Sequence, residues 1–212
     1  IPEGLEIAAV SEREDPRDVL VTLNGAKLHE LPHGAVLGTS SARREVQVLQ
    51  KRPDLKIKLM RGNVNTRLDK LAGKEYDAII LAAAGLNRLG LGDRCVQYFE
   101  VDDIIPAVGQ GILGVETRKG ENVDYLMDTM HCARSALQLE AERAFLIRLN
   151  GGCTIPMAAH AVIEGGRMKV YGMLASEDGE KLVRDTVEGE TDRAAQLGRE
   201  LAERLQRMLE GR

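Results

Sequence analysis

A cysteine on a glycine-rich loop is the residue best suited to covalent chemistry in this sequence. Cys153 directly follows Gly152, and Pro156 fixes the backbone shortly after it. Glycine lets a backbone come close to a ligand, and a thiol on such a loop can act as a nucleophile. A small buried thiol beside a turn is the alternative interpretation, because free cysteine is commonly a core residue.

Arginine side chains follow the expected ends of three strands. In the segment 38–44 a strand ends at a glycine, and the next helix starts among hydroxyl residues whose backbone N–H groups can bind an anion. Guanidinium groups hold carboxylates through paired hydrogen bonds, and the segments 60–67 and 85–89 repeat the arrangement. In open α/β sheets, ligands bind outside the carboxyl ends of the strands. We therefore expect a pocket for a ligand with several carboxylates, formed by Thr39, Ser40, Ser41, Arg43, Arg44, Arg61, Gly62, Arg67 and Arg88.

A plainer interpretation of these segments stands beside that one. The segment 38–44 could be an N-capped helix with solvated arginines, and any one of the other arginines alone could be a surface charge. What favours the pocket is that three strand ends repeat the same residue types.

The elements that must position these residues alternate between strands and helices in the first half of the chain. A short strand is expected at 5–10, and the charged segment 11–18 is expected to be a linker. Short helices between strands predict right-handed βαβ units and a mainly parallel sheet. The expected strands are 19–23, 35–38, 55–59 and 76–82, and the expected helices are 40–51, 64–71 and 83–89.

The second half of the chain predicts a different architecture. The glycine-rich segment 102–114 indicates a crossover or hinge before a candidate strand at 114–118. Short glycine-containing turns farther along favour an antiparallel sheet, and Thr191 is expected to cap the last helix. The expected helices are 123–130 and 135–149, and the expected strands are 157–163, 168–174 and 181–187.

Composition excludes several classes of protein. The chain has 212 residues, a net charge of −4 and a pI near 5.7, which argues against binding nucleic acid or an anionic membrane. It contains no run of the ~20 apolar residues that a spanning helix needs, and no signal peptide is expected at its start. Its three cysteines form no CxxC motif, so we expect neither a disulfide framework nor a zinc site, and we expect a reducing compartment such as the cytoplasm.

Two short motifs are rejected on physical grounds. The segment 29–33 fits HExxH, but Pro32 disrupts the continuous helix that a zinc site of this kind requires. The segment 109–114 fits GxGxxG, but a strand is expected after it, whereas dinucleotide binding requires a helix there.

Five segments of the chain together resemble the porphobilinogen deaminase family, also called hydroxymethylbilane synthase. They are 142–161, 38–44, 61–67, 84–89 and 106–111. The resemblance implies an enzyme of tetrapyrrole and haem biosynthesis, a transferase that condenses four molecules of porphobilinogen into hydroxymethylbilane and releases ammonia each time. It also implies that Cys153 carries a dipyrromethane cofactor through a thioether, and that the arginines hold the acetate and propionate groups.

The sequence departs from the family at its start. The catalytic aspartate of the family lies just before a segment that stands here at Pro2 to Leu5, and the chain begins at Ile1. The resemblance therefore implies that the catalytic aspartate lies upstream of Ile1, and that this chain lacks the N-terminal part of the first domain and has no catalytic residue of its own. A complementing N-terminal segment is then a candidate partner.

The resemblance also implies a division into domains. We expect the remainder of the first domain with a hinge at 1–14 and 106–130, a carboxylate-binding domain at 15–105, and a cofactor-attachment domain at 131–212. The expected fold class is α/β. It consists of a periplasmic-binding-protein-like domain with a mainly parallel sheet, followed by an α+β domain with a three-stranded antiparallel sheet.

Two other functions stay open: a non-catalytic module that binds carboxylates, or one half of a split enzyme. We expect Cys153→Ala to abolish cofactor attachment, whereas Arg43→Ala or Arg61→Ala should leave folding largely intact.

Overall fold

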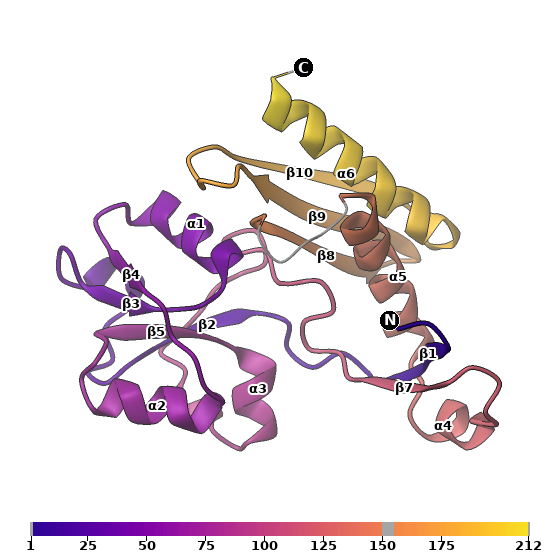
Figure 1. Ribbon diagram of the computed structural model, residues 1–212, viewed down its shortest axis with the longest axis horizontal. Helices are drawn as coiled ribbons and strands as arrows, with labels where there is room; N and C mark the ends of the chain where they lie inside the picture. Colours follow the sequence, from indigo (N-terminus) through magenta and orange to yellow (C-terminus); the bar gives the residue numbers. More distant parts are fainter. Residues whose placement is uncertain (1, 150–154, 212) are drawn as a thin grey trace.

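The computed structural model describes residues 2–149 and 155–211, which form three separate β-sheets and the helices that cover them (Figure 1). The mixed α/β class that the sequence predicts is confirmed. Most elements lie within two residues of their predicted positions, because the hydrophobic periodicity that marks a helix or a strand is a local signal.

The first large sheet has five strands and a mixed direction. Strand β3 is parallel to both β4 and β5, whereas β2 is antiparallel to β5 and to β6. The prediction of a mainly parallel sheet is therefore wrong for β2 alone, because β6 runs in the same direction as β3, β4 and β5. Only a short 3-10 helix, η1 (Leu28–Glu30), lies between β2 and β3, so no crossover helix sets the direction of β2. The strand order is β4 (Lys56–Lys58), β3 (Val36–Gly38), β5 (Ala78–Ala82), β2 (Asp18–Thr22) and β6 (Gln97–Tyr98).

Helices cover both faces of this sheet (Figure 1). Helix α1 (Ala42–Lys51) packs on one face against a core that includes Leu20 and Ile80. Helices α2 (Val64–Ala72) and α3 (Ala83–Arg88) pack on the other face against Val19 and Ile79. Neighbouring residues of β2 and β5 thus enter opposite cores, which is why both strands are apolar along nearly their whole length.

The C-terminal part is a three-stranded antiparallel sheet with two helices on one face, and the prediction of that sheet is confirmed. Phe145 of α5 and Leu201 of α6 are fully buried against the strands. Thr191 does not cap the last helix, because a 3-10 turn precedes its first α-helical residue. The elements are α5 (Ala133–Arg148), β8 (Met157–Glu164), β9 (Arg167–Ala175), β10 (Leu182–Glu190), the 3-10 helix η3 (Thr191–Arg193) and α6 (Ala194–Glu210).

A two-stranded antiparallel sheet forms the third unit, and both of its strands lie where the sequence predicts them. Because β7 follows the glycine-rich segment 109–114, the rejection of a dinucleotide motif there is consistent with the structure. The candidate zinc motif forms only η1, which is not a continuous α-helix. The remaining elements are β1 (Leu5–Val10), η1 (Leu28–Glu30), η2 (Gly92–Arg94), β7 (Gly114–Arg118) and α4 (Asp124–Thr129).

A small apolar cluster joins the five-stranded sheet to the C-terminal part. Val46 of α1 and Ile105 contact Met173 of β9 and Ala158 of β8. Within residues 2–149 and 155–211, no helix is both long enough and apolar enough to cross a lipid bilayer.

Candidate functional site

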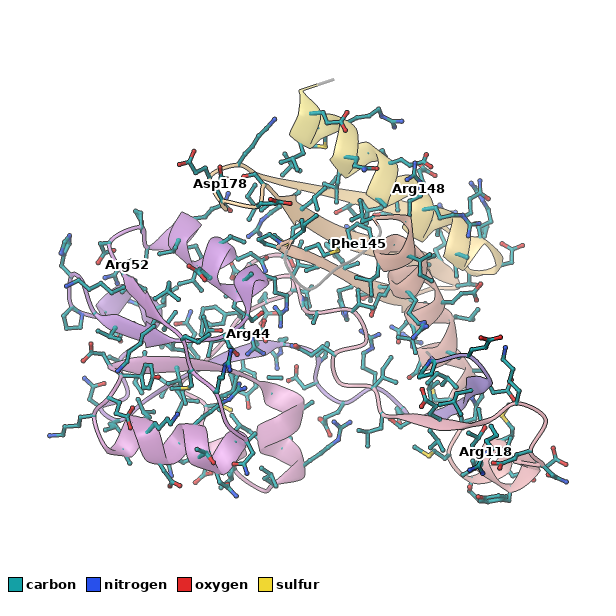
Figure 2. All side chains as sticks on the ribbon, in the orientation of Figure 1. Arg44, Arg52, Arg118, Phe145, Arg148 and Asp178 are labelled. Atoms are coloured by element: carbon teal, nitrogen blue, oxygen red, sulfur yellow. The ribbon has the colours of Figure 1, made fainter. Side chains whose placement is uncertain are left out.

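Arg43 and Arg44 lie in the first turn of α1, and their side chains point into the protein toward Asp18 at the start of β2. Asp18 Oδ2 lies 2.5 Å from Arg43 Nη1, and Asp18 Oδ1 lies 2.7 Å from Arg44 Nη2. The three side chains are 0%, 7% and 9% exposed for Asp18, Arg43 and Arg44. Figure 2 shows Arg44 at the five-stranded sheet. One buried carboxylate therefore holds both guanidinium groups, an arrangement that the sequence did not predict.

The same guanidinium groups also donate to neighbouring segments. Arg43 donates to the carbonyl oxygen of Ile105 at 3.0 Å and to Gln110 Oε1 at 2.7 Å. Arg44 donates to the carbonyl oxygen of Ile80 at 3.1 Å. Gln110 Nε2 in turn donates to Asp18 Oδ1 at 3.0 Å. The network thus connects α1 to β2, β5 and the crossover segment.

The charges in this network do not balance. Burial opposes ionisation of Asp18, but the charges and hydrogen bonds of Arg43 and Arg44 outweigh burial and lower the pKa of Asp18. Burial lowers the pKa of Arg44, and the positive charges of Arg43 and Arg67 act in the same direction, against the effect of Asp18. Two buried guanidinium groups share one carboxylate, and an additional anion would offset the excess positive charge.

The hydroxyl residues before α1 present different groups to a ligand. Thr39 is buried, and its Oγ1 accepts a hydrogen bond from the N–H of Ser41 at 3.1 Å. Ser40 is exposed. Ser41 is the N-cap residue of α1, but its side chain makes no capping hydrogen bond. The start of α1 thus keeps backbone donors that an anion can bind.

The second strand end places Arg61 and Gly62 at the surface, ahead of α2. Gly62 has a φ of +124°, and a Cβ there would lie 2.8 Å from the side chain of Thr66, so the turn requires glycine. Arg67 Nε donates to the carbonyl oxygen of Gly62 at 2.8 Å, and Asn63 caps α2 through the N–H of Thr66 at 2.9 Å. The turn thus carries the exposed Arg61 and holds the half-buried Arg67 against its backbone.

The third strand end uses its arginine differently. Arg88 is exposed, and its Nη2 donates to the carbonyl oxygen of Gly111 at 2.8 Å. Its charge also contributes, after the hydrogen bonds from Asp15 and Asn87, to the lowered pKa of Glu14. Arg88 therefore lies beside the two segments, 11–17 and 99–113, that connect the five-stranded sheet to the two-stranded sheet.

Two of the predictions from sequence concern residues that the structure does not describe. The first is the candidate covalent residue, Cys153, with its neighbour Gly152. Ile1, upstream of which the catalytic aspartate of the family is expected, also lies outside the described residues. Attachment through Cys153 and a catalytic aspartate upstream of Ile1 therefore stay predictions.

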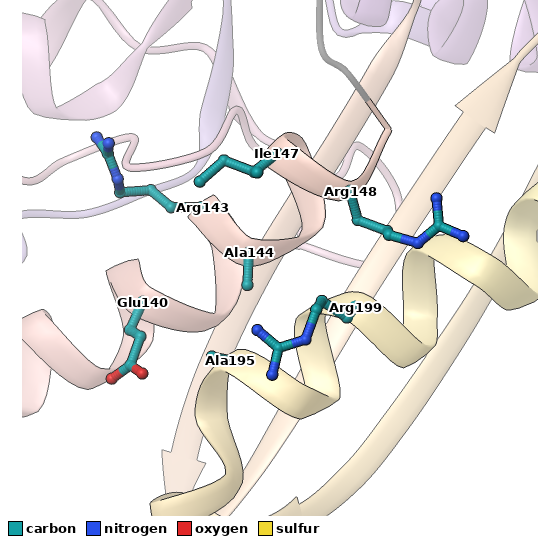
Figure 3. A pocket seen from close by; sticks show the side chains of 7 residues that line it. All are labelled: Glu140, Arg143, Ala144, Ile147, Arg148, Ala195 and Arg199. Carbon is teal, nitrogen blue, oxygen red and sulfur yellow. The ribbon is translucent and has the colours of Figure 1, made fainter.

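The helix that leads toward Cys153, α5, packs along α6. Arg148 Nε forms an ion pair with Glu203 Oε1 at 3.0 Å. A hollow of about 540 Å³ lies between these helices. Figure 3 shows the guanidinium group of Arg143 turned away from those of Arg148 and Arg199, so these arginines do not converge on one point.

Sequence reasoning missed Asp18 and Gln110 as parts of the site. The prediction of a linker over 11–18 is wrong at its last residue, because Asp18 begins β2 and is fully buried. A carboxylate directly before an apolar strand was the available signal. Gln110 lies in the glycine-rich segment, where the spacing of the glycines gave no indication of a side-chain role.

Comparison with known proteins matches nearly the whole chain. Residues 1–124 match the family model described as "Porphobilinogen deaminase, dipyromethane cofactor binding domain", and residues 136–207 match "Porphobilinogen deaminase, C-terminal domain". The porphobilinogen deaminase of Syntrophotalea carbinolica is 46% identical over 206 residues, which cover 97% of this chain and 65% of the relative. That of Pelobacter propionicus is 47% identical over 211 residues, covering 96% of this chain and 66% of the relative. A solved periplasmic binding protein with high arginine specificity, from Salmonella typhimurium, aligns with a TM-score of 0.36 at 18% identity, covering 58% of this chain and 55% of the other.

Proposed function

The chain belongs to the porphobilinogen deaminase family, and on that premise we propose that it is the cofactor-bearing part of a porphobilinogen deaminase. The proposed reaction is the condensation of four porphobilinogens into hydroxymethylbilane, with loss of ammonia at each step. The observation that carries this proposal is that two models of this one family match the chain in order, over residues 1–124 and 136–207. The chain spans about two thirds of the length of the curated relatives that it matches, at 65% and 66%.

Three domains follow from the proposal. Residues 1–14 and 106–130 belong to a first domain and its hinge, residues 15–105 form a periplasmic-binding-protein-like domain that holds carboxylates, and residues 131–212 form the domain of cofactor attachment. The three separate sheets support this division, since each lies within one of the proposed domains.

The residues at the strand ends fit a dipyrromethane, a group that carries several carboxylates. The buried cluster of Asp18, Arg43 and Arg44 has an excess of positive charge, and the start of α1 has backbone donors without a side-chain cap. Arg61, Arg67 and Arg88, with Gly62, would bind carboxylates nearer the surface. Thr39, Ser40 and Ser41 would donate from the turn before α1.

Cys153 is the proposed point of attachment, through a thioether to its sulfur. When bound, the dipyrromethane supplies the pyrrole end from which the product grows. The arginines act by orientation: they fix carboxylates, so that the reacting carbons of successive pyrroles stay close together. Asp18 acts as a positioning residue, because it is fully buried and holds Arg43 and Arg44 in place.

The proposed acid/base aspartate comes from a segment upstream of Ile1, as the family resemblance implies. Porphobilinogen is then the substrate, the N-terminal segment is the protein partner, and neither a nucleic acid nor a membrane is a partner. We place the reaction in the cytoplasm. Among the described residues, the thiols of Cys95 and Cys132 form no disulfide, as is usual in a reducing compartment.

Consumption of porphobilinogen tests this function. The chain, the complementing N-terminal segment and their equimolar mixture are each assayed, and the mixture alone should consume the substrate. A mixture with Arg61→Ala should bind the substrate more weakly and still fold. If no mixture consumes porphobilinogen, whereas calorimetry shows tight and reversible binding of simple dicarboxylates, the chain is a carboxylate-binding module and the enzymatic proposal fails.

A further inference from the structure

We propose that His160 is a pH-sensitive latch: when its imidazole ring gains a proton, it releases Arg13 and with it the linker, residues 11–17, that joins β1 to β2. This inference goes beyond the proposed function and does not depend on it, because the proposed reaction assigns no role to either residue. His160 lies in β8 and is 3% exposed. It lines a hollow of about 340 Å³, through which water can bring a proton to the ring.

Three buried side chains meet where the linker packs against the C-terminal part. Arg13 of the linker is 7% exposed, and Glu142 of α5 is fully buried. Arg13 Nη1 lies 2.7 Å from His160 Nδ1, and Arg13 Nη2 lies 2.8 Å from Glu142 Oε1. Arg13 Nε has no hydrogen-bond partner among the described residues, so these two contacts hold the whole guanidinium group.

The contact between Arg13 and His160 determines which ring nitrogen carries the proton. A guanidinium group has only donors and keeps its charge at every pH at which the protein is folded. A hydrogen bond from Arg13 to Nδ1 therefore requires that Nδ1 carry no proton. The structure thus fits the neutral ring with its proton on Nε2, beside one cation and one carboxylate whose charges balance.

Protonation of the ring breaks this arrangement. Nδ1 becomes a donor that faces another donor, and two positive groups then lie beside the single carboxylate of Glu142. Glu142 Oε1 lies 3.5 Å from His160 Nδ1, close enough to pair with the protonated ring in place of Arg13. Histidine ordinarily changes its charge between pH 5 and pH 8, so a modest fall in pH is enough to exchange the partners.

The other titratable groups around the ring do not take the place of Glu142. Glu12 is exposed, and Asp15 already pairs with Arg17 at 2.7 Å. Within residues 2–149 and 155–211, Glu142 alone has a carboxylate oxygen within ion-pairing distance of the ring. The groups that face His160 from the linker, from α5 and from β9 are, besides Arg13 and Glu142, the side chains of Glu12, Asp15, Cys132, Arg134 and Tyr171.

Release of Arg13 should loosen the linker along the crossover segment. The N–H of Ser11 donates to the carbonyl oxygen of Leu113 at 2.9 Å. The N–H of Glu14 donates to the carbonyl oxygen of Gly111 at 3.0 Å. A Cβ on Gly111 would lie 2.4 Å from the carbonyl oxygen of Glu14, so the two segments are closely packed. The amides of Ser11 and Glu14 therefore report on the latch.

Hydrogen exchange in three chains tests the latch. They are the wild type, His160→Asn and the control His29→Asn, in which the replaced histidine is exposed. Asparagine places an oxygen near the position of Nδ1 and does not titrate, so it can accept from Arg13 at every pH. Protection of the amides of Ser11 and Glu14 is measured at pH 8 and at pH 5.5, each relative to the intrinsic exchange rate at that pH.

From pH 8 to pH 5.5, protection should fall at least about tenfold in the wild type and in His29→Asn, and less than about twofold in His160→Asn. Nitrogen-15 spectra of the wild-type imidazole, which need no substitution, should show His160 Nδ1 without a proton at pH 8 and with one at pH 5.5. Three results would overturn the proposal: an equal loss of protection in the wild type and His160→Asn, no loss in the wild type, or a proton on Nδ1 already at pH 8 or still absent at pH 5.5.

Discussion

The carboxylate of Asp18 holds two arginines in the core, and this changes what substitution of either arginine should do. Arg43→Ala removes contacts to Asp18, Ile105 and Gln110 together. Breaking a buried pair from one side costs ~3–5 kcal/mol, so we expect a lower free energy of unfolding in urea. This replaces the expectation from sequence that Arg43→Ala leaves folding intact.

Arg61→Ala is the matched control, because Arg61 is exposed and its substitution should change the free energy of unfolding by no more than about 0.5 kcal/mol. Equal urea midpoints for Arg43→Ala and Arg61→Ala would show that the buried network contributes nothing.

Asp18 should also give the protein a specific sensitivity to acid. Its pKa is lowered in the folded state, so its stabilising effect is complete above its unfolded pKa of about 3.9 and is lost as the pH falls through the folded value. Asp18→Asn removes this dependence. The difference in unfolding free energy between the wild type and Asp18→Asn, measured from pH 7 to pH 2, should shrink toward low pH, and a constant difference would contradict the assignment.

The close packing of helix α5 against helix α6 depends on a glycine, Gly198. A Cβ on Gly198 would lie 2.0 Å from the carbonyl oxygen of Ala141, so the two helices can approach this closely only with glycine there. We expect Gly198→Ala to destabilise the protein by ~1–3 kcal/mol, as overpacking does. Thermal unfolding of Gly198→Ala should therefore begin at a lower temperature than that of the wild type.

Gly85→Ala serves as the control for Gly198→Ala, because both glycines lie in helices. A Cβ on Gly85 would meet Val64 at 3.6 Å, an ordinary contact, and helix propensity favours alanine. The account of the helix contact fails if Gly198→Ala is as stable as Gly85→Ala.

Individual helices and strands could be predicted from sequence, whereas the direction of strands and the pairing of distant side chains could not. The periodicity of 135–149 is contained in the residues themselves, and so is the strand at 114–118. The direction of β2 depends on the path of the whole chain, since β2 is preceded by a linker and followed by no crossover helix. The pairing of Asp18 with Arg43 has the same origin: the residues are 25 positions apart and meet only in the folded sheet.

At the scale of the whole molecule, Glu142 of α5 connects three segments that are far apart in the sequence. Its carboxylate accepts from the N–H of Gly109 at 2.7 Å and from the N–H of Ala161 at 2.8 Å, and it lies 2.8 Å from Arg13 Nη2. Glu142→Ala should lower the unfolding free energy by ~3–5 kcal/mol and accelerate hydrogen exchange at Gly109.

Glu203→Ala breaks the exposed ion pair with Arg148 instead, and it should cost no more than ~1 kcal/mol. If hydrogen exchange at Gly109 is equal in Glu142→Ala and Glu203→Ala, Glu142 does not connect the crossover segment to α5.

The sequence motifs predicted which residues lie at the strand ends of the candidate site. They did not predict how those side chains pack. The arginines and hydroxyls at the strand ends follow from residue types at expected strand ends. That Arg43 and Arg44 are buried follows from the tertiary position of Asp18. The attachment through Cys153 stays a prediction, because the residue lies outside those that the structure describes.

The central claim, that this chain carries a dipyrromethane on Cys153, is tested most directly by intact mass. The chain is incubated with porphobilinogen and the complementing N-terminal segment, and its mass is compared with that of Cys153→Ser and of Cys132→Ser. We predict a mass excess of two linked porphobilinogen-derived units in the wild type and in Cys132→Ser, and none in Cys153→Ser. An excess that persists in Cys153→Ser, or its absence from all three chains, would contradict the claim.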